Sequence, residues 1–411
     1  IFADDLASVS RVGQPNTADL VVSGVGLVCL LEATRRALGP PLMIVAMVFA
    51  SYIFFGQHAP EIIAWQGASF DKAMSHLWIT QEGVFGIALG VSTSFVFLFV
   101  LFGALLDKAG AGNYFIKVAF AALGHLRGGP AKAAVLASAM TGLISGSSIA
   151  NVVTTGTFTI PLMKRVGFSA EKAGSVEVAS SVNGQIMPPV MGAAAFLMVE
   201  YVGISYQDVV KHAFLPAVIS YIALFYLVDL EAAKNGMKGL PKSGPIRTAM
   251  QKVNGFLIGI AVTAVLAAIT YYGIGWMKDL FGDNTGWALS LVLLAVYVVL
   301  IRFAAQYPDL ELDDPNAEVV ELPEMGPTAK TGFHYLLPIV VLVWFLMIER
   351  KSPGLSAFWA TALLIFQVLT QKPLKAFFRG ESDYVAAFKS GVADLLMGMA
   401  DGARNMIGIG V

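Results

Sequence analysis

The chain contains repeated apolar stretches, each roughly 20 residues long, separated by short polar segments. A helix needs about 20 apolar residues to cross the hydrocarbon layer of a bilayer, which is ~30 Å thick. Hydrophobic residues make up 56% of the 411-residue chain and charged residues only 13%, and the mean hydropathy is +0.71. An ordinary globular domain is far less apolar. The sequence therefore predicts an all-α protein that crosses a membrane several times.

Eight continuous stretches have the length and composition of a span. They are about Ala18–Leu38, Pro41–Phe55, Gly83–Leu106, Val209–Leu230, Gly255–Tyr272, Trp287–Phe303, Tyr335–Ile348 and Leu355–Leu369. The segment after the fourth stretch is basic between Lys234 and Lys252, so the positive-inside rule predicts that it is cytoplasmic. The acidic segment Asp309–Glu324 is then also cytoplasmic. Ser69–Thr80 alternates apolar and polar residues and predicts an interfacial arm on the outer side.

Two further stretches do not complete a crossing. Counting back from the basic segment places Lys108, Arg127 and the pair Lys164-Arg165 on the cytoplasmic side. We therefore expect Tyr114–His125 to be an amphipathic helix along the cytoplasmic interface. By the same reasoning, Ala131–Pro161 begins and ends on the cytoplasmic side. It is predicted to be a re-entrant hairpin.

Several classes of function are disfavoured by composition. The lone Cys29 excludes an intrachain disulfide, and five scattered histidines predict no metal cluster. A formal net charge of -1 without a basic block argues against nucleic-acid binding. The G-x-x-x-x-G-K-[ST] string that binds phosphate does not occur, so ATP is not expected as the direct energy source. Since the chain starts at Ile1 and stops inside an apolar stretch, we expect it to be a piece of a longer protein.

The predicted hairpin turns at a Gly/Ser segment, Ser145-Gly146-Ser147-Ser148. Such a turn at membrane depth frees backbone polar groups, and these must be satisfied by protein, water or a bound ion. Asn151 and Thr155 follow four residues apart, so both lie on one face of the returning helix. Sodium prefers several neutral oxygens of this kind. The turn therefore predicts an ion site.

The second segment is Ser180–Pro189, within an apolar stretch long enough to span. Its paired prolines and Gly184 predict a broken helix, because proline removes a backbone donor and disfavours helical geometry at the residue before it. The two ends of a broken helix suit a cation and a carboxylate. From both segments we select sodium candidates and substrate candidates. The sodium candidates are Ser145, Gly146, Ser147, Asn151, Asn183 and Gly184, and the substrate candidates are Ser148, Thr154, Thr155, Gln185 and Pro188.

Other polar residues are interpreted as structural. Glu177 and Lys172 lie near the basic Lys164-Arg165 pair and are predicted to be interfacial. The histidines are expected at interfaces, in loops or on the horizontal helix, and no chemistry is assigned to them. They are His58, His76, His125, His212 and His334.

The two segments resemble the fused membrane subunit of tripartite ATP-independent periplasmic (TRAP) transporters. The matching strings are residues 143–152, 157–165 and 182–192. The likeness extends along nearly the whole chain and is to the TAXI-type fusion, in which a small part and a large, DctM-like part form one polypeptide.

The resemblance implies an elevator-type transporter of inverted-repeat fold in a bacterial or archaeal inner (plasma) membrane. It also implies sodium as the coupling ion with no other cofactor, a small carboxylate substrate, and a periplasmic solute-binding protein as partner. A homo-oligomer is a further open expectation. Residues 1–66 would end the small part, 67–108 would form an arm and a scaffold helix, and 109–230 the first-repeat transport region. Residues 231–350 would hold a cytoplasmic linker and further helices, and 351–411 an incomplete second repeat.

In that second repeat, an arm is expected near Asp383–Gly391 and a hairpin from about Arg404, so half of the site would be absent.

Three alternatives stay open from the residues themselves. An ion channel can also use a re-entrant hairpin, a carrier can couple to protons instead of sodium, and an intramembrane enzyme would need a nucleophile with a depth-matched His or Asp. The Ser-rich turn offers no such partner in the sequence, so we do not expect an enzyme.

Overall fold

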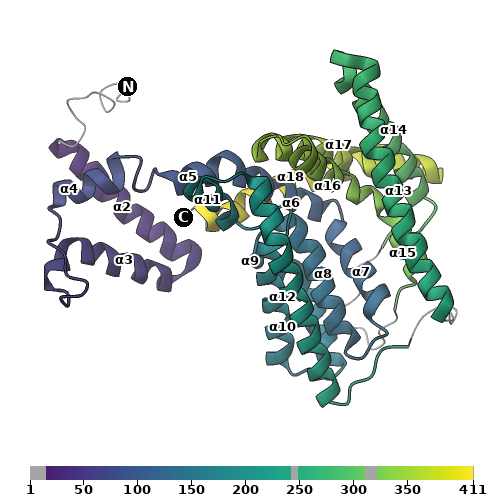
Figure 1. The fold of residues 1–411 in the computed structure, drawn as a ribbon, viewed down its shortest axis with the longest axis horizontal. Coiled ribbons are helices and arrows are strands. Elements are labelled where there is room, and N and C mark those ends of the chain that lie inside the picture. Colours follow the sequence, from purple (N-terminus) through teal and green to yellow (C-terminus); the bar gives the residue numbers. More distant parts are fainter. Residues whose placement is uncertain (1–14, 242–248, 311–321, 411) are drawn as a thin grey trace.

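The computed structural model describes residues 15–241, 249–310 and 322–410, and every regular element in these ranges is a helix (Figure 1). The helices of the first half are α2 (Thr17–Leu38), α3 (Pro40–Phe55), α4 (Phe70–Met74), α5 (Ile87–Val91), α6 (Phe97–Lys108), α7 (Ala111–Leu123), α8 (Gly129–Ser145), α9 (Ser148–Arg165) and α10 (Ala170–Asn183). Those of the second half are α11 (Ala193–Val202), α12 (Tyr206–Lys234), α13 (Ala249–Phe281), α14 (Thr285–Ala304), α15 (Met325–Thr331), α16 (Leu336–Val343), α17 (Pro353–Arg379) and α18 (Tyr384–Gly410). The predicted all-α fold is confirmed.

Each of the eight predicted spans falls on helix, with shifted ends. Six described stretches are long and apolar enough to cross a membrane. They are Thr17–Leu38, Pro40–His58, Ile87–Lys108, Tyr206–Lys234, Ala267–Ala304 and Pro353–Arg379. A seventh forms if α15 and the helical stretch Phe333–Ile348, which bend by 47°, are taken together. The chain is therefore a multi-pass membrane protein.

The third span begins later than the sequence predicts, at Ile87 instead of Gly83. Gly83 lies in a turn where the Val84 amide donates to the Leu77 carbonyl at 2.8 Å. A Cβ on Gly83 would lie 2.2 Å from that carbonyl oxygen, so the turn requires glycine. The preceding arm is helical as expected, with α4 continuing into a wider turn at Ser75–Ile79.

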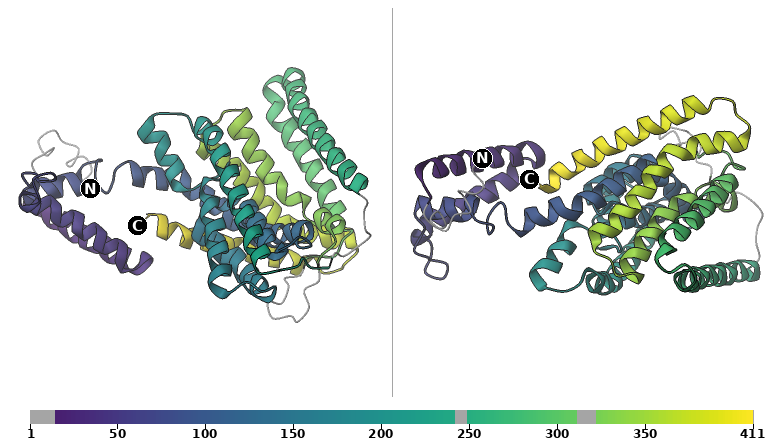
Figure 2. Two further views of the ribbon diagram at one scale, coloured as in Figure 1. Left: turned by 60° about the horizontal axis from the view of Figure 1, so that its bottom comes forward. Right: turned by 90° about the horizontal axis from the view of Figure 1, so that it is seen from above.

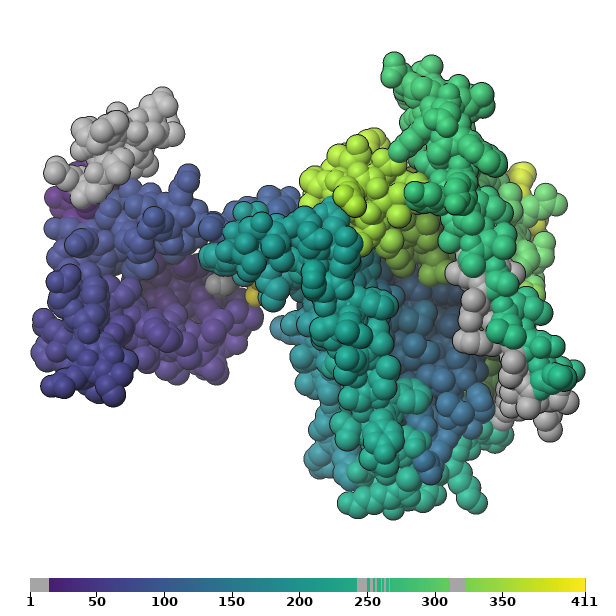
Figure 3. All heavy atoms as spheres, in the orientation of Figure 1, coloured from purple at the N-terminus to yellow at the C-terminus, as the bar shows by residue number. Residues whose placement is uncertain are grey.

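The N-terminal helices α2, α3 and α4 lie to one side of the main body and connect to it through α5 (Figures 1 and 3). Asn16 caps α2 through the Asp19 amide, and Gly39, with a φ of 88°, separates α2 from α3. α3 has no buried residue, although its sequence is almost entirely apolar. Its side chains therefore require lipid or another protein around them.

The main body has two packed groups of helices. α8, α9, α10 and α12 lie side by side, and α7 packs against α8 (Figure 1). α6 packs against α17 and α18, which also pack against each other; the right-hand view of Figure 2 shows α18 in yellow and α17 in yellow-green. The largest apolar cluster joins the groups and includes Phe99, Phe102, Phe115 and Phe196, each at most 1% exposed. This cluster holds the α8–α10 region against α6.

The helix predicted over Tyr114–His125 is present as α7, and eight of its residues are buried, with α8 and α15 packed against it. Its position along the membrane interface stays a prediction. One sequence expectation needs correction. The expected arm near Asp383–Gly391 and the expected hairpin start at Arg404 lie on one uninterrupted helix, α18. Its run from Tyr384 to Gly410 contains no proline to break it. Residues 1–14, 242–248 of the basic segment and 311–321 of the acidic segment lie outside the described residues.

Candidate ion and substrate site

The hairpin turn and the broken helix lie against each other. α8 ends at Ser145, Gly146 adopts a left-handed φ of 59°, and α9 begins at Ser148. A Cβ on Gly146 would lie 2.2 Å from the carbonyl oxygen of Met191, in the segment after the break. Glycine is therefore needed both for the turn and for this close approach. The predicted hairpin and its turn residues are confirmed.

The break in the second element is also confirmed. α10 ends at Asn183, a single 3₁₀ turn follows at Gly184–Ile186, and helix resumes only at Ala193. The chain folds back, with the Gly192 amide donating to the Gln185 carbonyl at 2.7 Å.

Tyr206, at the start of α12, satisfies carbonyl groups that the break releases. Its hydroxyl lies 2.6 Å from the Val190 oxygen and 2.9 Å from the Pro189 oxygen. The ring is 2% exposed and stacks on Phe196 with ring centroids 4.7 Å apart. A buried carbonyl without a partner is costly in an apolar environment. Tyr206 therefore stabilises the non-helical backbone, a role that its position in the sequence did not indicate.

The two elements cross at a pair of glycines. A Cβ on Gly142 of α8 would lie 2.7 Å from the Cα of Gly184. A Cβ on Gly184 would lie 3.1 Å from the side-chain nitrogen of Asn151. Only glycine at both positions permits this backbone separation. Gly184 is thus confirmed at the junction, and the sequence analysis missed Gly142.

Asn151 contributes a free oxygen at this junction. It is 0% exposed, and its Nδ2 donates to the carbonyl oxygen of Ser138 at 3.0 Å and to its Oγ at 2.9 Å. Its Oδ1 is buried without a hydrogen-bond partner among the described residues. A buried carbonyl oxygen without a donor requires either a cation or an ordered water. Among the described candidates, Asn151 therefore has the geometry that best fits an ion ligand.

Other candidates at the turn bond mainly to one another. The Ser147 hydroxyl caps α9 by accepting from the Ala150 amide at 3.3 Å. Gln185 Nε2 donates to Ser148 Oγ at 2.8 Å and so joins the hairpin to the broken helix. Ser145 Oγ donates weakly to the Ser147 carbonyl at 3.5 Å. These side chains define the junction between the two elements.

The four remaining candidates have different surroundings. Asn183 Oδ1 accepts from the Ser220 hydroxyl of α12 at 2.9 Å. Thr155 donates to Glu177. Thr154 lines a cavity of about 780 Å³ with Ser145 and Ser147. Pro188 is buried, and its peptide bond to Pro189 is cis.

That cavity separates the hairpin from α6 and α18. Its polar lining includes residues that the sequence analysis did not select: Asp107, Lys108, Asn113, Thr141, Asp401 and Asn405. Lys108 and Asp401 form an ion pair at 2.8 Å. An acid at the end of an otherwise apolar span was the available signal for Asp107. The cavity therefore has a mixed lining, with polar groups of the hairpin, α6 and α18 among apolar side chains.

One interpretation of a single residue is wrong. Glu177, predicted to be interfacial, is 0% exposed between α9 and α10, because Thr155 and Thr159 supply hydroxyl partners that sequence spacing on one helix does not reveal. His334, predicted for an interface or loop, lies in the 3₁₀ turn Phe333–Tyr335 between α15 and α16 and is 0% exposed. Lys172 is exposed and pairs with Glu231, as an interfacial residue would.

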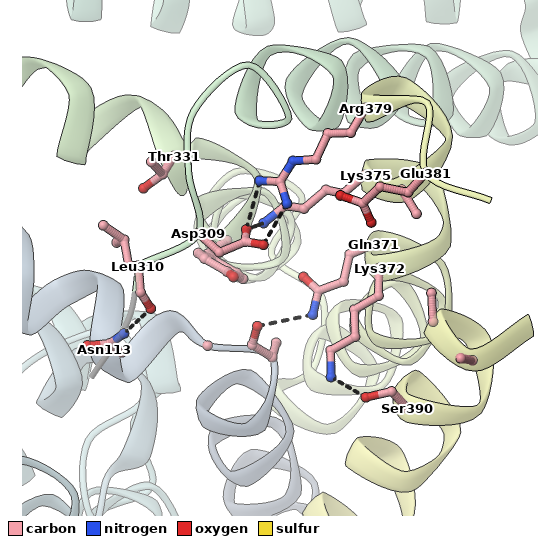
Figure 4. A pocket seen from close by; sticks show the side chains of 16 residues that line it. Asn113, Asp309, Leu310, Thr331, Gln371, Lys372, Lys375, Arg379, Glu381 and Ser390 are labelled. Carbon is pink, nitrogen blue, oxygen red and sulfur yellow. Dashed lines mark hydrogen bonds and ion pairs between the residues drawn. The ribbon is translucent and has the colours of Figure 1, made fainter. Parts of the chain in front are cut away.

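A second cavity, of about 530 Å³, lies among α7, α15, α17 and α18 (Figure 4). Asp309 enters it and is bound by Arg379 at 2.7 Å and Lys375 at 3.2 Å. Gln371 Nε2 donates to the Ala109 carbonyl at 3.0 Å. Burial raises the pKa of Asp309, but the hydrogen bond from Arg379 and the charge of Lys375 outweigh this and hold that pKa below its usual range. The ion pairs fasten the segment after α14 to α17.

Comparison with known proteins identifies the family. The family model described as tripartite ATP-independent periplasmic transporter, DctM component, matches residues 25–389. The chain belongs to this family. The predicted resemblance to TRAP permeases is confirmed, and the family is one of transporter components, not of enzymes. The division of the chain at residue 66 stays a prediction, as do the individual roles of the site residues.

Relatives of this TRAP permease include transporters with named substrates. The C4-dicarboxylate TRAP transporter large permease protein DctM of Rhodobacter capsulatus is 28% identical over 64% of this chain and 58% of its own length. The protein of the same name from Pseudomonas aeruginosa is 26% identical over 64% of this chain and 58% of its own length. The sialic acid TRAP transporter permease protein SiaT of Haemophilus influenzae is 27% identical over 62% of this chain and 38% of its own length. Each match covers less than two thirds of the relative.

Substitution of Gly142 by alanine tests the glycine crossing in this TRAP permease. We expect Gly142→Ala to lower the free energy of unfolding by about 1–3 kcal/mol, because the new methyl group overlaps backbone that cannot move aside. The control is Gly174→Ala in α10, where a Cβ meets nothing within 4 Å. It should be neutral or slightly stabilising. Thermal unfolding of the purified protein in detergent measures both, and equal unfolding temperatures would contradict the crossing.

Substitution of Asp309 tests the ion pairs in the second cavity. We expect Asp309→Asn to lower stability at pH 7 by about 0.5–1 kcal/mol, since the side chain is 60% exposed and screened. Because its pKa is lowered by folding, the carboxylate stabilises fully above its ordinary value of about 4 and loses this effect as pH falls through the lowered pKa. The difference between the two proteins should therefore vanish only in acid. Thermal unfolding against pH measures it, with exposed Asp283→Asn as the control; a pH-independent difference would refute the assignment.

Proposed function

We propose that the whole protein is the permease of a sodium-coupled secondary transporter that imports small organic acids across the bacterial inner membrane. One observation carries the proposal: a helical hairpin and a broken helix cross at Gly142 and Gly184, beside the buried side chain of Asn151 with its unpartnered oxygen. Paired broken elements are typical of midplane sites in secondary transporters. The relatives named for C4-dicarboxylates and sialic acid support an organic acid as substrate.

Sodium is proposed from the chemistry of the oxygens. Asn151 offers a neutral amide oxygen, and the turn adds the hydroxyls of Ser145 and Ser147 and nearby backbone carbonyls. Hard monovalent and divalent cations prefer such oxygen ligands, whereas thiolates and imidazoles suit transition metals. The substrate carboxylate is proposed to bind near Ser148 and Gln185, whose side chains are joined across the two elements. Serine and amide groups can donate to a carboxylate.

The proposed mechanism is of the elevator type. α8, α9, α10 and α12 would move as one body, and α6, α17 and α18 would form the fixed scaffold. The cavity of about 780 Å³ between the hairpin and α6 and α18 supports this division, because the two groups of helices are not tightly packed against each other there. The proposed partners are a periplasmic solute-binding protein and a small permease part. A bound cation and substrate would close the junction and so favour movement of the loaded body.

Uptake into proteoliposomes tests the function. The permease at its full natural length, with its binding protein, is given labelled organic acids with and without an inward sodium gradient. We expect sodium-dependent uptake and a rise of about tenfold or more in the half-saturating sodium concentration for Asn151→Ala, because a buried ion ligand is removed. Asn235→Ala, at an exposed amide in the cap of α12, is the control. Uptake indifferent to sodium would overturn the coupling, and a proton gradient would then be tested in its place.

A further inference from the structure

Glu177 is a buried carboxylate at the centre of the hairpin region that the proposed function has not used. It projects from α10 toward α9 and is 0% exposed. Its oxygens accept from the hydroxyls of Thr155 and Thr159, the latter at 2.5 Å, and from Ser181 at 3.3 Å. A Cβ on Gly156 would lie 3.1 Å from the Glu177 Cγ, so glycine there lets the acid approach α9.

All three partners are hydroxyl groups that can donate. An ionised carboxylate only accepts hydrogen bonds, and charge-assisted O–H···O contacts are about 2.5–2.7 Å long. The Thr155 and Thr159 hydroxyls also lie 2.8 Å and 3.0 Å from the carbonyl oxygens of Asn151 and Thr155, and each hydroxyl has one proton to donate. The hydroxyls can therefore donate to an ionised carboxylate, or donate to these carbonyls and accept from a protonated carboxyl. No lysine, arginine or histidine acts on Glu177 among the described residues. A buried charge without an opposite charge is strongly unfavourable, so the carboxyl is either protonated or balanced by a cation from outside the chain.

A chain of polar side chains leads from this carboxylate to the unpartnered oxygen. Ser181 Oγ lies 3.3 Å from Ser138 Oγ, across α10 and α8. Ser138 Oγ accepts from Asn151 Nδ2 at 2.9 Å, and Asn151 Oδ1 is the free acceptor at the junction. All three links are buried. Buried side chains thus connect the Glu177 carboxylate to Asn151, the candidate cation ligand, and none of them is exposed to water.

We propose that Glu177 is a positioning residue whose fixed negative charge sets the affinity of the Asn151 site for its coupling cation without touching the ion. The inference rests on the proposed function. Opposite charges attract strongly through a buried, low-dielectric region. Each charge then stabilises the other. Binding of the cation therefore recovers part of the free energy that burying the carboxylate costs. The hydroxyl chain holds Ser138 and Asn151 in the orientation that leaves Oδ1 free.

Glu177→Gln separates charge from shape, because the amide keeps the size and one acceptor oxygen. We expect the half-saturating sodium concentration for uptake to rise about tenfold or more, with the substrate KM at saturating sodium changed less than about threefold. A purely structural role would change expression or maximal rate but not sodium affinity selectively. Glu200→Gln removes an exposed carboxylate from α11 and is the matched control.

A second variant guards against misfolding. Ser181→Ala keeps the carboxylate but cuts the chain, and we expect about a threefold rise in the half-saturating sodium concentration. If Glu177→Gln does not yield folded protein, Ser181→Ala tests the inference instead, through uptake and through the sodium-induced rise in its unfolding temperature in detergent. A sodium affinity within about twofold of the unsubstituted protein in the folded variants would overturn the inference. A wild-type protein without sodium dependence would instead refute the proposed function, and the inference with it.

Discussion

Inside a bilayer, backbone N–H and C=O groups have no water to bond, so a helix can be interrupted only where other groups satisfy them. The structure depends on this constraint at Gly146 and at the stretch after Asn183. The chain supplies partners locally, with Tyr206 at the Pro189 and Val190 carbonyls and Gly192 at the Gln185 carbonyl. Tyr206 lies at the start of α12, and Gly192 lies after the break. The break, the fold-back and the start of α12 therefore form one cooperative unit.

The same constraint explains which residues surround the junction. Elements that must touch through backbone require small side chains, and Gly142, Gly184 and Gly146 each lie where a Cβ would overlap a neighbour. α6 combines both kinds of contact: Phe99 and Phe102 join the apolar cluster, and a Cβ on Gly103 would lie 2.8 Å from the Ile144 carbonyl oxygen of α8. Rings fill a core between helices that pack normally, whereas glycines permit the close crossing of interrupted ones. Close crossings at glycines and ordinary packing of aromatic rings therefore occur side by side along α6 and α8.

The sequence predicted the hairpin turn and the broken helix correctly because glycine and proline act locally on backbone geometry. It did not place Glu177, whose partners Thr155 and Thr159 lie on another helix about twenty residues away. The proximity of Glu177 to basic residues in the sequence favoured a position at the membrane interface. Hydroxyl groups from α9 instead stabilise this side chain in a buried position. Asn183 was selected for its place beside the break, but Ser220 on α12 draws its side chain away. Contacts between helices are not encoded in the spacing along one helix.

The distribution of charge in the hairpin region bears on how transport could be coupled. With Glu177 ionised and no cation bound, α8–α10 would carry an unbalanced buried charge, since no basic side chain among the described residues acts on it. Moving such a body through an apolar surround is unfavourable, whereas a bound monovalent cation would cancel the charge. A soluble binding protein can deliver substrate but cannot supply this balance. On the proposed mechanism, the fixed carboxylate would therefore make cation occupancy a condition for movement, independently of which organic acid is carried.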